Sequence, residues 1–219
     1  MKLLNLLSFS AILMTSVGFS QSNNPLYLDA NQPVEVRLDD LMSRMTLEEK
    51  VYQMNQFVGL DHMREAEKNL SVEDLHSNDA QGFYKGLFSD DVAQMTKEGK
   101  IGSFLHVLTT EEANLLQELA FQSRLKIPIL IGIDAIHGNA LVSGTTVYPS
   151  PISLASTWSD AFLYDVGKQS AKEMRATGSH WAFTPNIDVL RDPRWGRVGE
   201  TFGEDPYMVG NMGAAMING

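Results

Sequence analysis

The sequence predicts an α/β fold, in which β-strands and α-helices alternate along the chain. Two continuous apolar runs, residues 101–107 and 128–133, predict strands and enclose a segment whose leucines recur at helical spacing. A long helical segment and a third strand-like stretch follow, so the pattern repeats. Strands that are apolar throughout are typical of parallel sheets covered by helices on both faces. With 43% hydrophobic and 20% charged residues in 219, the chain can bury such a core.

The first twenty residues have the pattern of a secretory signal peptide. Met1-Lys2 is a short basic start, Leu3 to Phe19 is mostly apolar, and Gly18 and Ser20 place small residues before Gln21 as a cleavage site requires. The apolar run is shorter than the roughly 20 residues that span a bilayer. A cleaved signal is therefore favoured over a membrane anchor or a buried helix. We expect export to the periplasm or the extracellular space, with no membrane insertion after cleavage.

Two short helices are predicted after the signal. Residues 21–32 are polar and contain Asn and Pro, which predicts an exposed lead-in before a domain that spans 33–219. Apolar residues then recur at helical spacing from Leu38 to Met45. The following Thr46-Leu47-Glu48-Glu49 is a capping box, which opens a second helix that we expect to continue to Met54.

The regular alternation begins after a charged segment. Residues 61–100 are mixed in character, and we expect a surface excursion there, with a possible helix start at Ser71 to Asp74. Residues 101–107 are the first predicted strand. Thr109 with Glu112 then opens a helix, and residues 128–133 form the second strand.

The second repeat consists of a helix that begins at Ser159 and a third strand from Trp181 to Val189. Gly178 can adopt the left-handed conformation that ends many helices. Asp205-Pro206 has the N-cap and first-turn residues of a fourth helix. The helix that begins at Ser159 has four residues on its predicted inward face: Leu163, Val166, Ser170 and Met174.

Spacing alone leaves two α/β architectures open, a (β/α)8 barrel of the TIM type and a doubly wound sheet. A full barrel uses about 250 residues, and the stretch from Ile101 to Gly219 is less than half of that. We therefore expect three to four βα units. If the architecture is a barrel, this chain holds its N-terminal portion.

The composition excludes several functional classes. Seventeen basic against 27 acidic side chains give a net charge of -10 without a basic cluster, which argues against nucleic acid as a partner. The absence of cysteine excludes disulfides, cysteine-bound zinc, thiolate nucleophiles and iron–sulfur clusters. The histidines lack ligand spacing, and no phosphate or dinucleotide motif occurs. We expect neither a metal nor another cofactor.

Residues just past the predicted strands are the candidates for chemistry, because active sites of α/β folds lie beyond the C-terminal ends of the strands. Asp134 ends the second apolar run, where an ionised carboxylate needs hydrogen-bond donors. Sugar hydroxyls could supply them, or the carboxylate could cap the following loop, and the residues alone favour neither reading. His137, beside Gly138, is favoured as a structural hydrogen-bonding residue over a general base.

A second candidate region, RDPRWGR at Arg191–Arg197, follows the third strand. Its guanidinium groups suit paired oxygen ligands. Trp195 and Gly196 shape a turn that offers a stacking face. For Arg191 and Arg194 the sequence favours surface ion pairs with nearby carboxylates, which are Asp188, Asp192, Glu200, Glu204 and Asp205.

Four long segments resemble glycoside hydrolase family 3, in its β-glucosidase branch. The resemblance runs from about Val34 to the last residue. The segments, in order, are LMSRMTLEEKVYQM (41–54), GKIGSFL (99–105), GIDAIHGNALVSGTTVYPSPISLASTW (132–158) and FTPNIDVLRDPRWGRVGETFGEDPYMVG (183–210). The resemblance implies a (β/α)8 barrel, which spacing leaves undecided.

The resemblance also implies roles for individual residues. Asp134 would bind the outer hydroxyls of the nonreducing sugar in subsite -1, and Arg197 would line the same subsite. Four further residues would support the site: His137, Trp195, Gly196 and Glu200, the last by holding Arg197.

The implied activity is retaining hydrolysis of terminal nonreducing β-D-glucosyl residues from β-glucosides and oligosaccharides. In the family, a Lys-His pair, an aspartate nucleophile and an acid/base glutamate complete the site, and all would fall after Gly219. We therefore expect no catalytic residue in these 219 residues, and no activity from them alone. A β-xylosidase is the alternative within the family, since its RDPRWGR region is very similar. A noncatalytic sugar-binding module is the alternative from another class.

Overall fold

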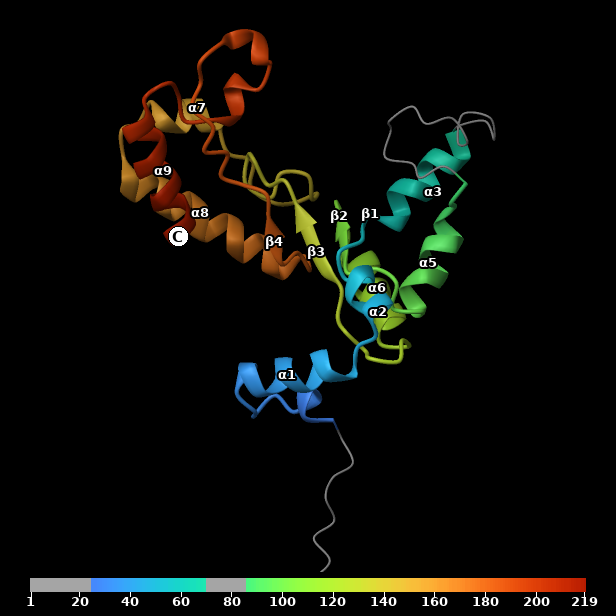
Figure 1. The fold of residues 1–219 in the computed structure, drawn as a ribbon. Coiled ribbons are helices and arrows are strands. Elements are labelled where there is room, and N and C mark those ends of the chain that lie inside the picture. Colours follow the sequence, from blue (N-terminus) through green and yellow to red (C-terminus); the bar gives the residue numbers. More distant parts are fainter. Residues whose placement is uncertain (1–24, 70–85) are drawn as a thin grey trace, which may run out of the picture. The chain divides into compact units, whose positions relative to one another are not determined.

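The computed structural model describes residues 25–69 and 86–219 (Figure 1). The described residues fall into two compact units, which divide between Arg44 and Met45. The predicted signal peptide and the helix start predicted at Ser71 to Asp74 fall outside the described residues. None of the helices in the described ranges combines the length and the hydropathy needed to cross a membrane.

The N-terminal unit contains a 3-10 turn, η1 (Leu26–Leu28), and the helix α1 (Val34–Arg44). The backbone N–H of Tyr27 donates to the Asp40 carboxylate at 3.1 Å, and Nε of Arg37 donates to the Tyr27 carbonyl at 3.0 Å. These bonds fold the turn against α1. Part of the predicted exposed lead-in is therefore packed on the helix that follows it.

Four parallel strands form the sheet of the larger unit, in the order β1-β2-β3-β4. Each strand pairs with the next one in the chain, and Leu105 of the second strand lies opposite Gly132 of the third. A strand order without reversal is that of a (β/α)8 barrel, whereas a doubly wound sheet reverses its order. The unit is therefore a partial barrel. The strands are β1 (Gln56–Val58), β2 (Ser103–Leu105), β3 (Leu130–Ile133) and β4 (Trp181–Ala182).

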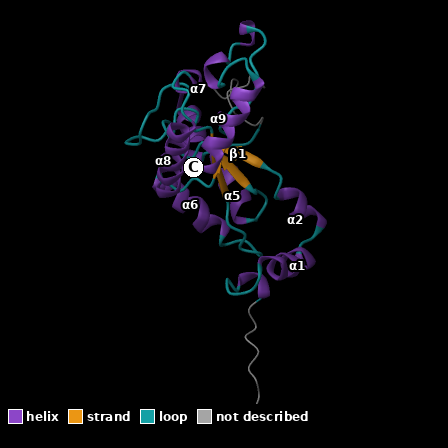
Figure 2. Ribbon diagram, turned by 90° about the vertical axis from the view of Figure 1, so that its left-hand side faces the viewer, coloured by secondary structure: helices purple, strands orange, loops and turns teal. Residues whose placement is uncertain are grey.

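Helices and loops connect the strands (Figure 2). After β3 and β4 the connections include long loops, and these loops carry the candidate site residues. The helices of the larger unit are α2 (Leu47–Tyr52), α3 (Leu60–Asn69), α5 (Ser89–Lys97), α6 (Thr110–Ala120), α7 (Pro151–Ala155), α8 (Asp160–Ala176) and α9 (Pro206–Asn218), with the 3-10 turns η2 (Pro193–Trp195) and η3 (Val198–Glu200).

The helix starts predicted at Thr46, Thr109 and Asp205 are confirmed by their capping bonds. The Thr46 hydroxyl accepts from the backbone N–H of Glu49, and the Glu49 carboxylate accepts from that of Thr46, which completes the capping box of α2. Thr109 caps α6 by accepting from the backbone N–H of Glu112 at 3.1 Å. Asp205 caps α9 in the same way. The four residues predicted on the inward face of α8 are all buried.

Two predictions about the strands and their surroundings are wrong. The segment predicted as a surface excursion contains the helices α3 and α5, whose contact with the core depends on few side chains, among them Met63 and Val92. The strand β1 was not predicted, because only one of its three residues, Phe57, is buried. The third predicted strand is much shorter than expected, since only Trp181–Ala182 pair with β3.

The core of the larger unit has two main parts. One lies beneath β1, β2 and β3, where Phe104, Leu116 and Ile131 are fully buried together with Met63 of α3. The other lies where α8 and α9 pack on each other, and includes Leu163, Val166, Phe202, Val209 and Met212. The first cluster thus fixes the strands. The second cluster fixes α8 and α9, which precede β4 and follow the loop after it.

Candidate sugar-binding site

The centre of the candidate site is a hydrogen bond between two residues that directly follow neighbouring strands. His106 comes after β2 and Asp134 comes after β3. Nε2 of His106 lies 3.0 Å from Oδ2 of Asp134. Because an ionised carboxylate can only accept, the imidazole donates through Nε2–H. The side chains are 32% and 45% exposed, so the pair is accessible from solvent at the carboxyl edge of the sheet.

The backbone at this edge turns sharply. His106 and Ala135 have φ angles of +57° and +48°, in the left-handed region that costs a residue with a Cβ about 1 kcal/mol or more. The backbone N–H of His106 still donates to the Gly132 carbonyl at 2.9 Å. That bond ties the turn to the end of β3, so both side chains project from a rigid part of the sheet.

A close approach from β1 fixes the same turn from the other side. The N–H of Gly59 donates to the carbonyl of Leu105 at 2.9 Å. A Cβ at Gly59 would lie 2.9 Å from the His106 carbonyl oxygen and 2.9 Å from Oε1 of Glu112. Only glycine fits this approach without displacing one of these groups.

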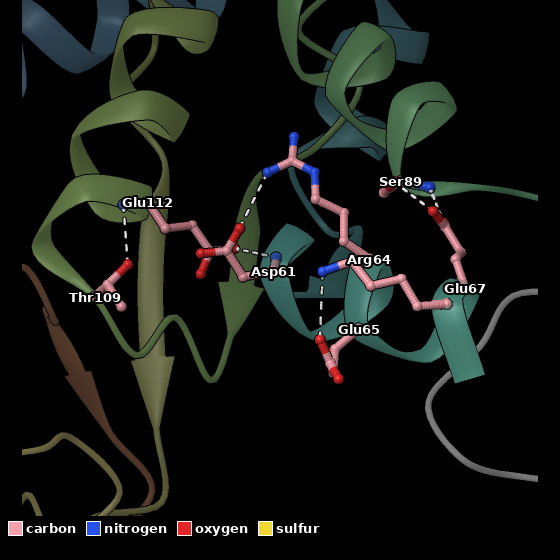
Figure 3. A network of polar contacts seen from close by, with 8 residues as sticks. Asp61, Arg64, Glu65, Glu67, Ser89, Thr109 and Glu112 are labelled. Carbon is pink, nitrogen blue, oxygen red and sulfur yellow. Dashed lines mark hydrogen bonds and ion pairs between the residues drawn. The ribbon is translucent and has the colours of Figure 1, made fainter. Parts of the chain in front are cut away.

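The Glu112 carboxylate joins α6, the helix after β2, to α3, the helix after β1. Figure 3 shows it extending from α6 to Asp61 at the start of α3, where Oε1 accepts from the Asp61 N–H at 3.0 Å. Burial raises the pKa of Glu112, although the backbone bonds to Asp61 and Leu60 oppose this. A similar contact joins α3 to α5, where Glu67 accepts from the N–H and the hydroxyl of Ser89. These carboxylates join neighbouring helices of the larger unit, α6 to α3 and α3 to α5.

Arg197, the second predicted sugar-binding residue, lies in the loop after β4 and is held by Glu200. Its Nε and Nη2 both donate to Oε2 of Glu200, at 2.9 and 2.6 Å. Nδ2 of Asn186 donates to the same oxygen at 2.9 Å. The Glu200 carboxylate raises the pKa of Arg197, and Arg197 lowers the pKa of Glu200. The two shifts agree and describe one ion pair.

The loops after β3 and β4 approach each other closely enough for their charges to interact. Glu200 is the main cause of the raised pKa of Arg197, and the carboxylates of Asp188 and Asp134 raise this pKa further. His137 is near enough to Glu200 to contribute to the lowered pKa of that carboxylate. The structure therefore brings Asp134, Arg197, His137 and Glu200 into one electrostatic environment.

His137 bonds within its own loop. Its Nδ1 lies 3.0 Å from the Tyr148 carbonyl oxygen, and the Tyr148 N–H donates to the His137 carbonyl at 2.9 Å. Gly138 follows with φ +72°, and a Cβ there would lie 2.7 Å from the Tyr148 ring. The ring of His137 thus braces the loop that carries Asp134.

The RDPRWGR segment forms a compact turn. Asp192 caps η2 and pairs with the Arg194 guanidinium. Gly196 has φ +87°, which allows the chain to reverse before Arg197. The Trp195 side chain is 41% exposed and lines an open hollow of about 230 Å³ together with Asp188, Val189, Arg191 and Asp192.

Sequence reasoning missed His106 and the contact between Asn186 and Glu200. His106 directly follows β2 (Ser103–Leu105) in the structure, but the predicted strand ran from residue 101 to 107 and placed His106 inside it, so the positional criterion that selected Asp134 did not select His106. It was considered only as a metal ligand, for which it has no spacing. Asn186 stands past β4, but nothing in the sequence connects it with Glu200 before the loop is folded.

Comparisons with known proteins identify the family. The family model for the glycosyl hydrolase family 3 N-terminal domain matches residues 46–219. A periplasmic β-glucosidase of Salmonella typhimurium is 32% identical over 197 residues, which are 89% of this chain and 21% of that protein. A β-xylosidase of Formosa agariphila is 39% identical over 127 residues, covering 55% of this chain and 18% of that protein.

A solved structure shows the same fold. The crystal structure of a Listeria innocua β-glucosidase in complex with isofagomine matches with a TM-score of 0.64 and 30% identity, covering 86% of this chain and 23% of that one. The chain therefore spans about a fifth of the length of these relatives. The family model covers most of the chain, from the capping box of α2 to the last residue. The chain belongs to glycosyl hydrolase family 3.

Proposed function

We propose that this chain supplies part of the -1 sugar subsite of a retaining β-glucosidase, with Asp134 and Arg197 as the substrate-binding residues. The observation that supports this most directly is the placement of an exposed carboxylate and an exposed guanidinium on adjacent loops at the carboxyl edge of a partial barrel. A carboxylate accepts from sugar hydroxyls, and a guanidinium donates to them.

The chemistry proposed for the complete enzyme requires two further carboxyl groups. An aspartate attacks the anomeric carbon while a glutamic acid protonates the leaving oxygen, and water then releases the sugar from the enzyme. Following the family resemblance, we place both groups outside these 219 residues. Asp134 and Arg197 would bind hydroxyls of the nonreducing sugar and hold the anomeric carbon in line with the nucleophile.

The proposed substrates are β-glucosides and oligosaccharides with a nonreducing β-D-glucosyl residue. Two relatives support different substrates, since one is named a β-glucosidase and another a β-xylosidase. A glucosyl residue differs from a xylosyl residue by its hydroxymethyl group. The ratio of kcat/KM on 4-nitrophenyl β-glucoside and β-xyloside separates these two functions, and we expect it to favour the glucoside.

Export is part of the proposal. The signal-peptide pattern of residues 1–20 supports it, and one relative is named as periplasmic. We expect the mature protein to begin at Gln21. Intact-mass analysis of secreted or periplasmic material that still carried Met1 to Ser20 would contradict this.

The central experiment is the substitution Asp134→Ala in the complete enzyme. If Asp134 binds sugar hydroxyls more strongly in the transition state than in the ground state, kcat/KM should fall without loss of folding. Removing a charged partner of a hydroxyl costs about 2 to 4 kcal/mol, or roughly 30- to 1000-fold in kcat/KM.

The control is Asp90→Ala on α5, an exposed carboxylate in the first turn of that helix. This variant should keep wild-type kcat/KM. Near-normal turnover by Asp134→Ala would remove Asp134 from the subsite. Saturable sugar binding without turnover in the wild-type protein would favour the noncatalytic sugar-binding module.

A further inference from the structure

We propose that His106 is a positioning residue, which holds the Asp134 carboxylate in the orientation that binds the sugar. The inference rests on the proposed function of Asp134 and adds a residue that the family motifs quoted above do not contain. It is carried by the 3.0 Å bond between Nε2 of His106 and Oδ2 of Asp134.

The carboxylate needs an external partner to stay in one orientation. Its side chain is 45% exposed and follows the last residue of a strand, so packing restrains it little. Within the described ranges, the hydrogen bond that reaches this side chain comes from His106. The bond engages Oδ2 and leaves Oδ1 available to accept from a sugar hydroxyl. One oxygen is thus held while the other binds.

The backbone of His106 shows that the imidazole is supplied at some cost. Its φ of +57° would suit Gly better than any residue with a Cβ, and Asn and Asp at least as well as His. The strain is maintained by the bond from its N–H to Gly132 and by the close approach of Gly59 to its carbonyl. A strained residue held this firmly at a site edge is a candidate for function. The feature that distinguishes His from the better-suited residues is the reach of Nε2.

Two substitutions separate the side chain from the backbone. His106→Asn suits the left-handed backbone, but its amide is too short to reach Oδ2 of Asp134. His106→Gln places an amide N–H near the position of Nε2. We expect His106→Asn to lower kcat/KM about 3- to 20-fold, a range that allows for the partial exposure of the pair. His106→Gln should recover most of this loss.

A double-mutant cycle with Asp134→Ala tests whether His106 acts through Asp134. In the wild-type background His106→Asn should change the same kinetic constant as Asp134→Ala, either by lowering kcat or by raising KM. In the Asp134→Ala background it should change kcat/KM less than about twofold. If the two effects instead multiply, His106 acts independently of Asp134, and the inference is wrong. If His106→Asn fails to fold, His106→Gln is measured alone, and a loss of turnover by this folded variant would contradict the inference.

A structural measurement keeps this test independent of the proposed function. Crystal structures of the wild type and of His106→Asn should show the Asp134 carboxylate well ordered in the first and rotated or disordered in the second. An unchanged carboxylate would overturn the inference even if the enzyme is active. A wild-type enzyme without glycosidase activity would overturn the proposed function, while this comparison would still decide whether His106 positions Asp134.

Discussion

At the scale of single residues, the site consists of polar groups whose partners come from elsewhere in the chain. Asp134 could be selected from the sequence because it ends an apolar run that predicts a strand. Its partner could not, because His106 lies 28 residues earlier and only the pairing of β2 with β3 places the two side chains together. The same holds for Asn186 and Glu200, which meet when the loop after β4 folds back.

The first prediction at this scale concerns the support of Arg197. In Glu200→Gln the guanidinium loses the charge of its partner, and an amide oxygen accepts more weakly than a carboxylate. We expect kcat/KM to fall about 3- to 10-fold, since both side chains are partly exposed. The measurement is turnover of an aryl β-glucoside by the complete enzyme.

Asp192→Asn is the matched control for Glu200→Gln. It weakens the neighbouring pair between Asp192 and Arg194, in which Arg194 is 89% exposed. This variant should leave kcat/KM unchanged. Equal losses in both variants would mean that the loop as a whole, and not the orientation of Arg197, determines activity.

A second residue-scale prediction concerns Glu112. Burial raises its pKa in the folded protein above the ordinary value of about 4.3. The folded state therefore binds this proton more tightly than the unfolded state. The stabilisation is fully present below the ordinary pKa and is lost as the pH rises through the folded-state pKa.

The variant Glu112→Gln removes this titration and keeps an oxygen that can accept from Asp61. The free energy of unfolding should therefore decline less above about pH 4.3 than in the wild type. Glu111→Gln, on the exposed side of the same helical turn, should retain the wild-type slope. Parallel curves for the wild type and Glu112→Gln would contradict the prediction.

At the scale of elements, the sequence predicted helices better than strands. Helix starts have local chemical signals, and the caps at Thr46, Thr109 and Asp205 lie where those signals indicate. Strands of two to four residues have no comparable signal, because their ends are set by the neighbouring strand. The helices α3 and α5 were missed since their exposed faces are highly charged and their apolar faces are narrow.

The packing of α8 on α9 gives a prediction at this scale. A Cβ at Gly167 would lie 2.2 Å from the carbonyl oxygen of Met216, so Gly167→Ala must push the helices apart. Overpacking of this kind typically costs about 1 to 3 kcal/mol. Because the contacting atom is the backbone carbonyl oxygen of Met216, it cannot move aside through a change of side-chain rotamer.

Gly210→Ala is the matched control for Gly167→Ala. Gly210 lies inside α9 with nothing within 4 Å of its added Cβ, and alanine should stabilise a helix there by about 0.5 to 1 kcal/mol. Chemical denaturation of both variants measures the difference. Stabilisation by Gly167→Ala would show that the backbone of α9 does not approach Gly167 as closely as the 2.2 Å contact with Met216 implies.

At the scale of the whole molecule, the strand order identifies a barrel but the described strands do not close one. The predicted alternation of strands and helices was correct in type, and the family resemblance chose the barrel over the doubly wound sheet. What could not be predicted was how each strand end contributes to the site, because this depends on register. Leu105 opposite Gly132 is the detail that places His106 beside Asp134.

The open sheet leads to the last prediction, which concerns residues 21–219 expressed alone. Within the described residues β1 and β4 each pair with one neighbour, and Leu130 and Trp181 are more than 40% exposed. Parallel strands normally have both faces covered and both edges paired. Because one or two kcal/mol is a large share of a domain's stability, this product should aggregate or unfold without a cooperative transition. It should also lack turnover of aryl β-glucosides, since both proposed catalytic carboxyl groups lie outside it. A cooperative thermal transition without turnover would favour a sugar-binding module, and measurable turnover would show that the catalytic residues lie within these residues after all.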